Sequence, residues 1–145
     1  MKNNARKYHI LLTILIMVFI FIQSALPGDL SGRESNLIVQ FLAERFSLDL
    51  LAVSFAVRKT GHFLEYLILG CSLVPVMRNH RMGSVLAWAI GSVYAVTDEI
   101  HQLFVPGRSC EIRDMCIDSC GVLAGVVIVL LIYRLRNMRA KRPTS

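Results

Sequence analysis

The side chains that could carry out chemistry are spaced three or four residues apart in three separate stretches of the chain. These groups are His62 and Glu65, Asp98 with His101 and Gln102, and Asp114 with Asp118. Residues at this spacing share one face of an α-helix. Each stretch can therefore present a single polar stripe, and three such stripes can meet in one site.

Histidine beside a carboxylate is suited to proton transfer near neutral pH, because imidazole titrates there and the acid can orient it. We therefore assign His62, Glu65, Asp98 and His101 as candidate catalytic residues. Basic residues flank the stripes, and guanidinium groups match the oxygens of phosphates and carboxylates. The candidate residues for binding an anionic substrate are Lys59, Arg108, Gln102, Asp114 and Asp118, with Arg58 and Arg113 also near the mouth of the site.

The same side chains leave a second interpretation open, in which the site binds a divalent cation. Its ligands would be Glu65, Asp98, His101 and Asp118. The sequence contains no H-E-x-x-H motif, and the neighbouring basic residues would repel a cation. We therefore expect no cofactor, and a metal site is the less favoured alternative.

Four long apolar stretches must position these residues. A helix needs about 20 apolar residues to cross a bilayer, and it satisfies its own backbone hydrogen bonds there. The predicted spans are residues 10–26, 60–77, 83–105 and 115–135. The fold class is therefore all-α, a polytopic membrane protein whose 145 residues form one domain with a bundle of four transmembrane helices.

Basic residues are concentrated on one side of the predicted membrane. The segment before the first span, residues 78–82 and the tail at 136–145 contain no Asp or Glu. The positive-inside rule makes these segments, and hence both termini, cytoplasmic. The net charge of +6 then reflects topology and contact with lipid headgroups, and we expect no nucleic-acid partner.

Helical rise places three acids at a similar depth in the outer leaflet. At 1.5 Å per residue, Glu65, Asp98 and Asp118 each lie roughly 20 to 24 Å from the cytoplasmic end of their helices. A charge at the centre of a membrane helix costs about 2.5 to 3.5 kcal/mol on insertion scales, so such groups normally face a partner or a cavity. The polar stripes are thus predicted to converge beneath the outer headgroups.

The outer segment, residues 27–59, is the longest connection between spans. Apolar residues recur at helical spacing over 37–46, which predicts a short amphipathic helix on the outer surface. Ser47 is the expected N-cap of the next helix, which would run to Met77 with Gly61 as its weakest point.

Small residues four apart predict close helix contacts. Gly91 with Ala95 lies in the third span and Gly121 with Gly125 in the fourth. We therefore expect these two spans to pack tightly against each other.

The polar stripes lie within motifs that resemble the VanZ-like family of bacterial membrane proteins, named for a protein associated with resistance to the lipoglycopeptide teicoplanin. The matching motifs are Lys59-x-x-His62-Phe63-x-Glu65-Tyr66, Asp98-Glu99-x-His101-Gln102-x-Phe104-x-Pro106-x-Arg108 and Asp114-x-x-x-Asp118-x-x-Gly121. Many members carry Asn where this chain has Asp118, a departure that slightly favours the metal alternative. The resemblance covers roughly residues 27–131 and implies the bacterial envelope and glycopeptide tolerance, without implying a reaction.

These observations predict a plasma-membrane protein whose outer site engages an anionic lipid, a lipid-linked cell-wall intermediate or a lipoglycopeptide. If the protein is an enzyme, we expect acid–base transfer at a lipid headgroup. The main alternative is a non-enzymatic accessory subunit whose polar cluster holds its own or a partner's helices together. Proton or cation translocation is least favoured, because the inner halves of the spans carry few polar side chains.

Overall fold

The computed structural model describes residues 2–140, and it describes residues 2–3 and 28–36 by their backbone alone. Every regular element in this part of the chain is an α-helix, which confirms the all-α part of the predicted fold class. The helices are α1 (Lys2–Ala25), α2 (Gly28–Phe46), α3 (Leu50–Met77), α4 (Gly83–Gln102) and α5 (Ile112–Ala140). Residues 141–145 of the predicted basic tail lie outside the described residues.

Three helices are long and apolar enough to cross a bilayer. They are Asn4–Ala25, Leu50–Met77 and Ile112–Ala140. α4 is less apolar, because its 20 residues include Asp98, Glu99 and several small or polar side chains. The predicted spans are therefore confirmed in α1, α3 and α5, whereas the fourth, in α4, stays a prediction.

The connection between α2 and α3 differs from the predicted one. Ser47 is not the N-cap of α3, because it adopts the left-handed conformation (φ 52°, ψ 42°) that ends α2. Asp49 caps α3 instead, and its carboxylate accepts a hydrogen bond from the Ala52 N–H at 2.9 Å. Gly61 does not interrupt α3, which runs unbroken for 28 residues.

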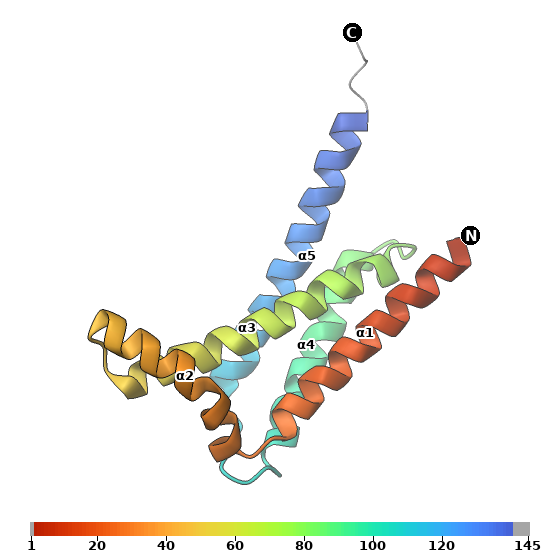
Figure 1. Ribbon diagram of the computed structural model, residues 1–145. Coiled ribbons are helices and arrows are strands. Elements are labelled where there is room, and N and C mark those ends of the chain that lie inside the picture. The colour runs from red at the N-terminus through yellow and green to blue at the C-terminus, as the bar shows by residue number, and fades with distance from the viewer. Residues whose placement is uncertain (1, 141–145) are drawn as a thin grey trace.

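The outer segment is more helical than predicted, since α2 begins at Gly28 rather than near residue 37. α2 folds back along the first part of α3 and extends to one side of the other helices (Figure 1). Its contact with α3 is made by Val39 and Ala43, which pack with Val53. α2 thus has one apolar face that is buried against α3 and another apolar face that is exposed.

The other four helices form the bundle, in which α3 and α5 pack most extensively. Gly121 and Gly125 make this close approach: a Cβ at either would overlap the carbonyl oxygen of Phe63 or Leu67 on α3. Gly121 and Gly125 therefore face the second predicted span, in α3, and the expected contact between the third and fourth spans is present as well, between α4 and α5. Gly91 of α4 does face α5, where it leaves room for the Val122 side chain.

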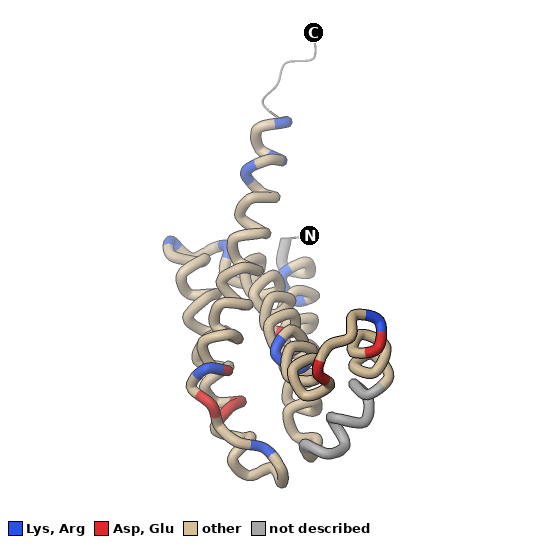
Figure 2. The backbone as a smooth tube through the Cα atoms, turned by 90° about the vertical axis from the view of Figure 1, so that its left-hand side faces the viewer, with Lys and Arg blue, Asp and Glu red and all other residues tan. Residues whose placement is uncertain are grey.

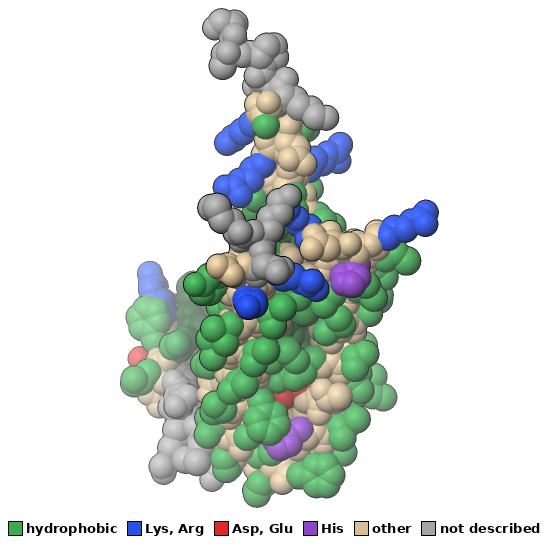
Figure 3. Space-filling view, turned by 90° about the vertical axis from the view of Figure 1, so that its right-hand side faces the viewer, with side chains coloured by type: hydrophobic (Ala, Val, Ile, Leu, Met, Phe, Trp, Pro, Cys, Tyr) green, Lys and Arg blue, Asp and Glu red, His purple; other side chains and the backbone are tan. Residues whose placement is uncertain are grey.

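α1 begins and α5 ends at the same end of the bundle, together with the turn between α3 and α4 (Figure 1). Basic residues gather at this end, whereas the acidic residues lie toward the opposite half (Figure 2). Between them the surface is largely apolar (Figure 3). Exposed large apolar side chains run along α1 and α5, as expected for helices that face lipid.

Candidate functional site

A polar pocket of about 190 Å³ lies between the C-terminal ends of α1 and α4, the first half of α3 and the loop that follows α4. Its acidic and imidazole groups are Glu65, Asp98 and His62, and its basic groups are Arg58 and Arg108. The remaining lining residues are Gln23, Ser24, Leu26, Val57 and Gly61. The structure therefore brings four predicted site residues into one cavity.

Arg108 is held in the pocket wall by the end of α1. Its Nε donates a hydrogen bond to the Leu26 carbonyl at 3.2 Å, and its Nη2 donates one to the Gln23 carbonyl at 3.2 Å. These are carbonyls at a helix C-terminus, where a cation is favoured. Burial lowers the pKa of Arg108, with the nearby Arg58 adding to the effect, but a guanidinium stays charged at neutral pH.

A second pocket, of about 210 Å³, opens between α1 and α3. Apart from Glu65, its lining is entirely apolar and comprises Leu15, Ile16, Phe19, Ile20 and Ile68. Glu65 lines both pockets, so the polar and apolar cavities meet at this side chain. A polar pocket and an apolar pocket therefore adjoin at Glu65.

Lys59 lies outside the polar pocket, in a buried ion-pair network with the start of α5. Its ammonium contacts the Asp114 carboxylate and lies 3.5 Å from Glu111 Oε2. Glu111 also accepts a hydrogen bond from Arg113 at 2.9 Å. This bond, followed by the charge of Lys59, lowers the pKa of Glu111. The predicted anion ligands Lys59 and Asp114 are thus engaged with each other.

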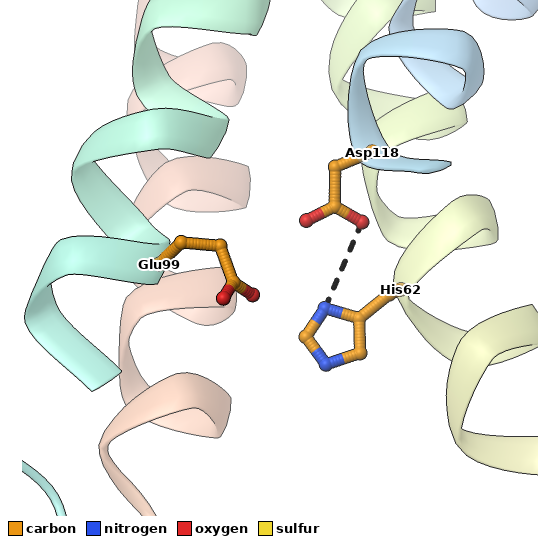
Figure 4. Close-up of side chains that lie close together, drawn as sticks. All are labelled: His62, Glu99 and Asp118. Carbon is orange, nitrogen blue, oxygen red and sulfur yellow. Dashed lines mark ion pairs between the residues drawn. The ribbon is translucent and has the colours of Figure 1, made fainter. Parts of the chain in front are cut away.

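Behind the pocket, three side chains from three helices point toward one another (Figure 4). They are His62 of α3, Glu99 of α4 and Asp118 of α5, and one ligand atom from each lies within 4.8 Å of the others. His62 Nδ1 is 3.7 Å from Asp118 Oδ1. Glu99 and Asp118 are fully buried. His62 is shared with the polar pocket, whereas the two acids do not line it.

The remaining predicted residues lie on α4 near Asp98. Asp98 is 3% exposed, and Ser24, Tyr66 and Gln102 lie beside it. His101 does not line the polar pocket and instead packs against the Phe21 ring of α1, with ring centroids 4.5 Å apart. Of the predicted stripe of Asp98, His101 and Gln102, only Asp98 lines the polar pocket.

Glu99 was missed as a site residue by the sequence reasoning. It follows Asp98 directly, so it points about 100° away around the helix, toward α5. Its Oε2 accepts a hydrogen bond from the Glu111 backbone N–H at 3.0 Å. The sequence did hold a signal for Glu99, namely two adjacent acids near the end of an apolar helix. Adjacent residues point in different directions, so both acids can avoid lipid only if other helices cover α4 on two sides.

The model of the VanZ/LLP1 family matches residues 9–133, which include His62 and all four acids of the pocket and the cluster, Glu65, Asp98, Glu99 and Asp118. No curated protein and no solved structure matches the chain. The match extends over most of the 145 residues and agrees with the three motifs on α3, α4 and α5. The chain belongs to the VanZ/LLP1 family of membrane proteins.

Proposed function

We propose that this protein binds the headgroup of an anionic amphiphile in the polar pocket, from the outer leaflet of the bacterial plasma membrane. The candidate ligands are an anionic lipid, a lipid-linked cell-wall intermediate and a lipoglycopeptide. Through such binding the protein would contribute to glycopeptide tolerance. We also propose that the chain crosses the membrane four times and that both of its termini are cytoplasmic.

Chain geometry supports a crossing by α4. Lys59, near the outer part of α3, contacts residues at the start of α5, and both α3 and α5 are long enough to span. α4 must therefore carry the chain from the inner end of α3 back to the outer start of α5, and its 20 residues measure about 30 Å. The basic residues at the opposite end favour a cytoplasmic location for it.

The observation that carries the proposal is the junction of two cavities at Glu65. An amphiphile needs a polar site for its headgroup and an apolar surface for its chain, and the two pockets supply these side by side. The apolar pocket lies between α1 and α3, whose outer surfaces carry exposed apolar side chains. A lipid tail can therefore reach it from within the bilayer.

The pocket's charges suit a headgroup that has both a phosphate or carboxylate and hydroxyl groups. Arg58 and Arg108 would contact the anionic oxygens. Glu65 and Asp98 can accept hydrogen bonds from hydroxyls and can orient His62. If a headgroup is also modified chemically, His62 is the group placed to transfer a proton.

Teicoplanin susceptibility of cells expressing Arg58→Gln tests the proposal. Arg58 lines the pocket and is exposed, so its loss removes a pocket charge without opening the core. We expect tolerance to fall at unchanged protein abundance. Arg45→Gln, the same change on exposed α2, is the matched control and should behave as wild type. Unchanged tolerance in Arg58→Gln would refute the pocket's role in it.

The same cells distinguish the alternative of a non-enzymatic accessory subunit. The network of Lys59, Asp114 and Glu111 favours that alternative, because it joins α3 to α5 without any ligand. If the polar residues serve assembly alone, tolerance will follow protein abundance across all variants. If the pocket binds a ligand, Arg58→Gln will lower tolerance without lowering protein abundance.

A further inference from the structure

We propose that His62, Glu99 and Asp118 form a binding site for one divalent transition-metal ion, of the Zn²⁺ or Mn²⁺ type. The site goes beyond the proposed headgroup pocket, because Glu99 and Asp118 do not line that pocket. It also differs from the ligand set suggested by the sequence, since His62 and Glu99 replace Glu65, Asp98 and His101. Only His62 belongs to both sites.

The geometry requires a small closure to coordinate an ion. Each of α3, α4 and α5 contributes one ligand atom, and these atoms lie within 4.8 Å of one another (Figure 4). Ligand atoms sit about 2.0 to 2.2 Å from Zn²⁺, so two ligands at a tetrahedral angle lie about 3.3 to 3.6 Å apart. The ligand atoms must therefore approach one another by up to roughly 1.5 Å, which rotations of the three side chains can supply.

Burial without hydrogen-bond partners is the second observation that points to a ligand. Glu99 and Asp118 are each 0% exposed. Within the part of the chain that is described, Glu99 Oε1, both Asp118 carboxylate oxygens and His62 Nδ1 accept or donate no hydrogen bond. Buried carboxylates without partners are costly, and a cation bound between them would satisfy all of these atoms at once.

A hydrogen bond from outside the cluster already orients one of the proposed ligands, Glu99. The Glu111 backbone N–H donates to Glu99 Oε2 at 3.0 Å, Oε1 has no hydrogen-bond partner among the described residues, and the Glu99 carboxylate points toward His62 and Asp118 (Figure 4). Hydrogen bonds of this kind fix the rotamer of a coordinating carboxylate and are worth about 10- to 100-fold in metal affinity.

The local charge balance also favours a cation. The sequence argument against metal relied on nearby basic residues, but the structure engages two of them, Lys59 and Arg108, with other partners. The Lys59 ammonium contacts Asp114 and Glu111, and Arg108 donates to the carbonyls at the end of α1. Two carboxylates and a neutral imidazole carry a charge that one dication cancels, and this mixed set suits Zn²⁺ or Mn²⁺ better than softer or harder ions.

The test uses the full chain purified in detergent with chelator, then dialysed against Zn²⁺ or Mn²⁺ alone, without added lipid. We expect one ion per chain by elemental analysis, and a loss of affinity of at least about 100-fold in Glu99→Gln and Asp118→Asn, since even outer-shell partners are worth about 10- to 100-fold. Asp98→Asn is the matched control. It makes the same change one residue earlier on α4 and should keep the ion.

His62→Cys separates coordination from a merely structural role. A thiolate favours Zn²⁺ over Mn²⁺, so this variant should retain Zn²⁺ and lose Mn²⁺, with helicity unchanged by circular dichroism. The proposal is overturned if wild type takes up neither ion, or if Asp98→Asn loses the ion as fully as Glu99→Gln. Because no lipid is present, either result leaves the headgroup proposal to be judged by its own test.

Discussion

Asp114 and Asp118 lie one turn apart on α5, and both are buried, yet their surroundings are opposite. Asp114 contacts the ammonium of Lys59. Among the described residues, the only ion-pair partner of Asp118 is the imidazole of His62, at 3.7 Å, and Asp118 shares its space with the carboxylate of Glu99. The first acid is balanced by the chain itself, whereas the second is placed where an added cation or proton must balance it. Position on one helix face therefore does not decide whether an acid is structural or binds a ligand.

The largest expected effect comes from breaking the balanced pair. Lys59→Met would leave Asp114 as a buried charge without its cation, and this should cost about 3 to 5 kcal/mol of unfolding free energy. Unfolding of the purified protein in mixed detergent measures it. Arg58→Met, the neighbouring exposed change, should cost less than about 0.5 kcal/mol. Similar losses in the two variants would show that the Lys59 pair is not structural.

The unbalanced acid should respond in the opposite way. In metal-free protein, Asp118→Asn should change the unfolding free energy by less than about 1 kcal/mol, because it removes a buried charge that lacks a full partner. Zn²⁺ at 100 times its Kd should stabilise wild type by about 2.7 kcal/mol and leave Asp118→Asn unchanged. Thermal shift with and without chelator measures both. Equal stabilisation of the two proteins would remove the distinction between Asp114 and Asp118.

The smallest expected effect is on the pH dependence of stability, through Glu111 in the ion-pair network of Lys59 and Asp114. Arg113 and Lys59 hold the pKa of Glu111 below its ordinary value. A depressed folded pKa means that Glu111 contributes its full stabilisation above the ordinary glutamate pKa of about 4.3 and loses it as the pH falls through the lower folded value. Glu111→Gln should therefore flatten the acid limb of stability against pH below about 4.3. A wild-type limb that already falls between pH 5 and 7 and disappears in Glu111→Gln would contradict this.

The helical class followed from the sequence, because the length and helical periodicity of apolar stretches are local properties. His62 and Glu65 do line one pocket, as their i, i+3 spacing predicts. Partners were harder to predict, since they depend on the rotation of each helix about its axis. The adjacent acids Asp98 and Glu99 face different neighbours, and a rotation of α4 by about 100° would bring Asp98 to the direction that Glu99 now faces.

Loops were the other source of error. The segment after α4 turns at Gly107, whose φ is 75°, and this brings Arg108 back to the end of α1. No periodicity in the sequence indicates such a contact. The same holds for Glu111, whose backbone N–H orients Glu99. Hydrogen bonds from loop residues to distant helix ends depend on tertiary placement, and sequence spacing does not contain it.

The most direct test of the central claim, that the pocket binds an anionic headgroup, is to fill the pocket. Gly61 lines it, and a Cβ at Gly61 meets nothing within 4 Å among the described residues. Gly61→Leu should therefore occupy the cavity without disturbing the packing, and Gly61→Ala should leave it open. Native mass spectrometry with added phosphatidylglycerol should show binding reduced at least about tenfold in Gly61→Leu and retained in Gly61→Ala. Equal binding by folded Gly61→Leu and wild type would contradict the account.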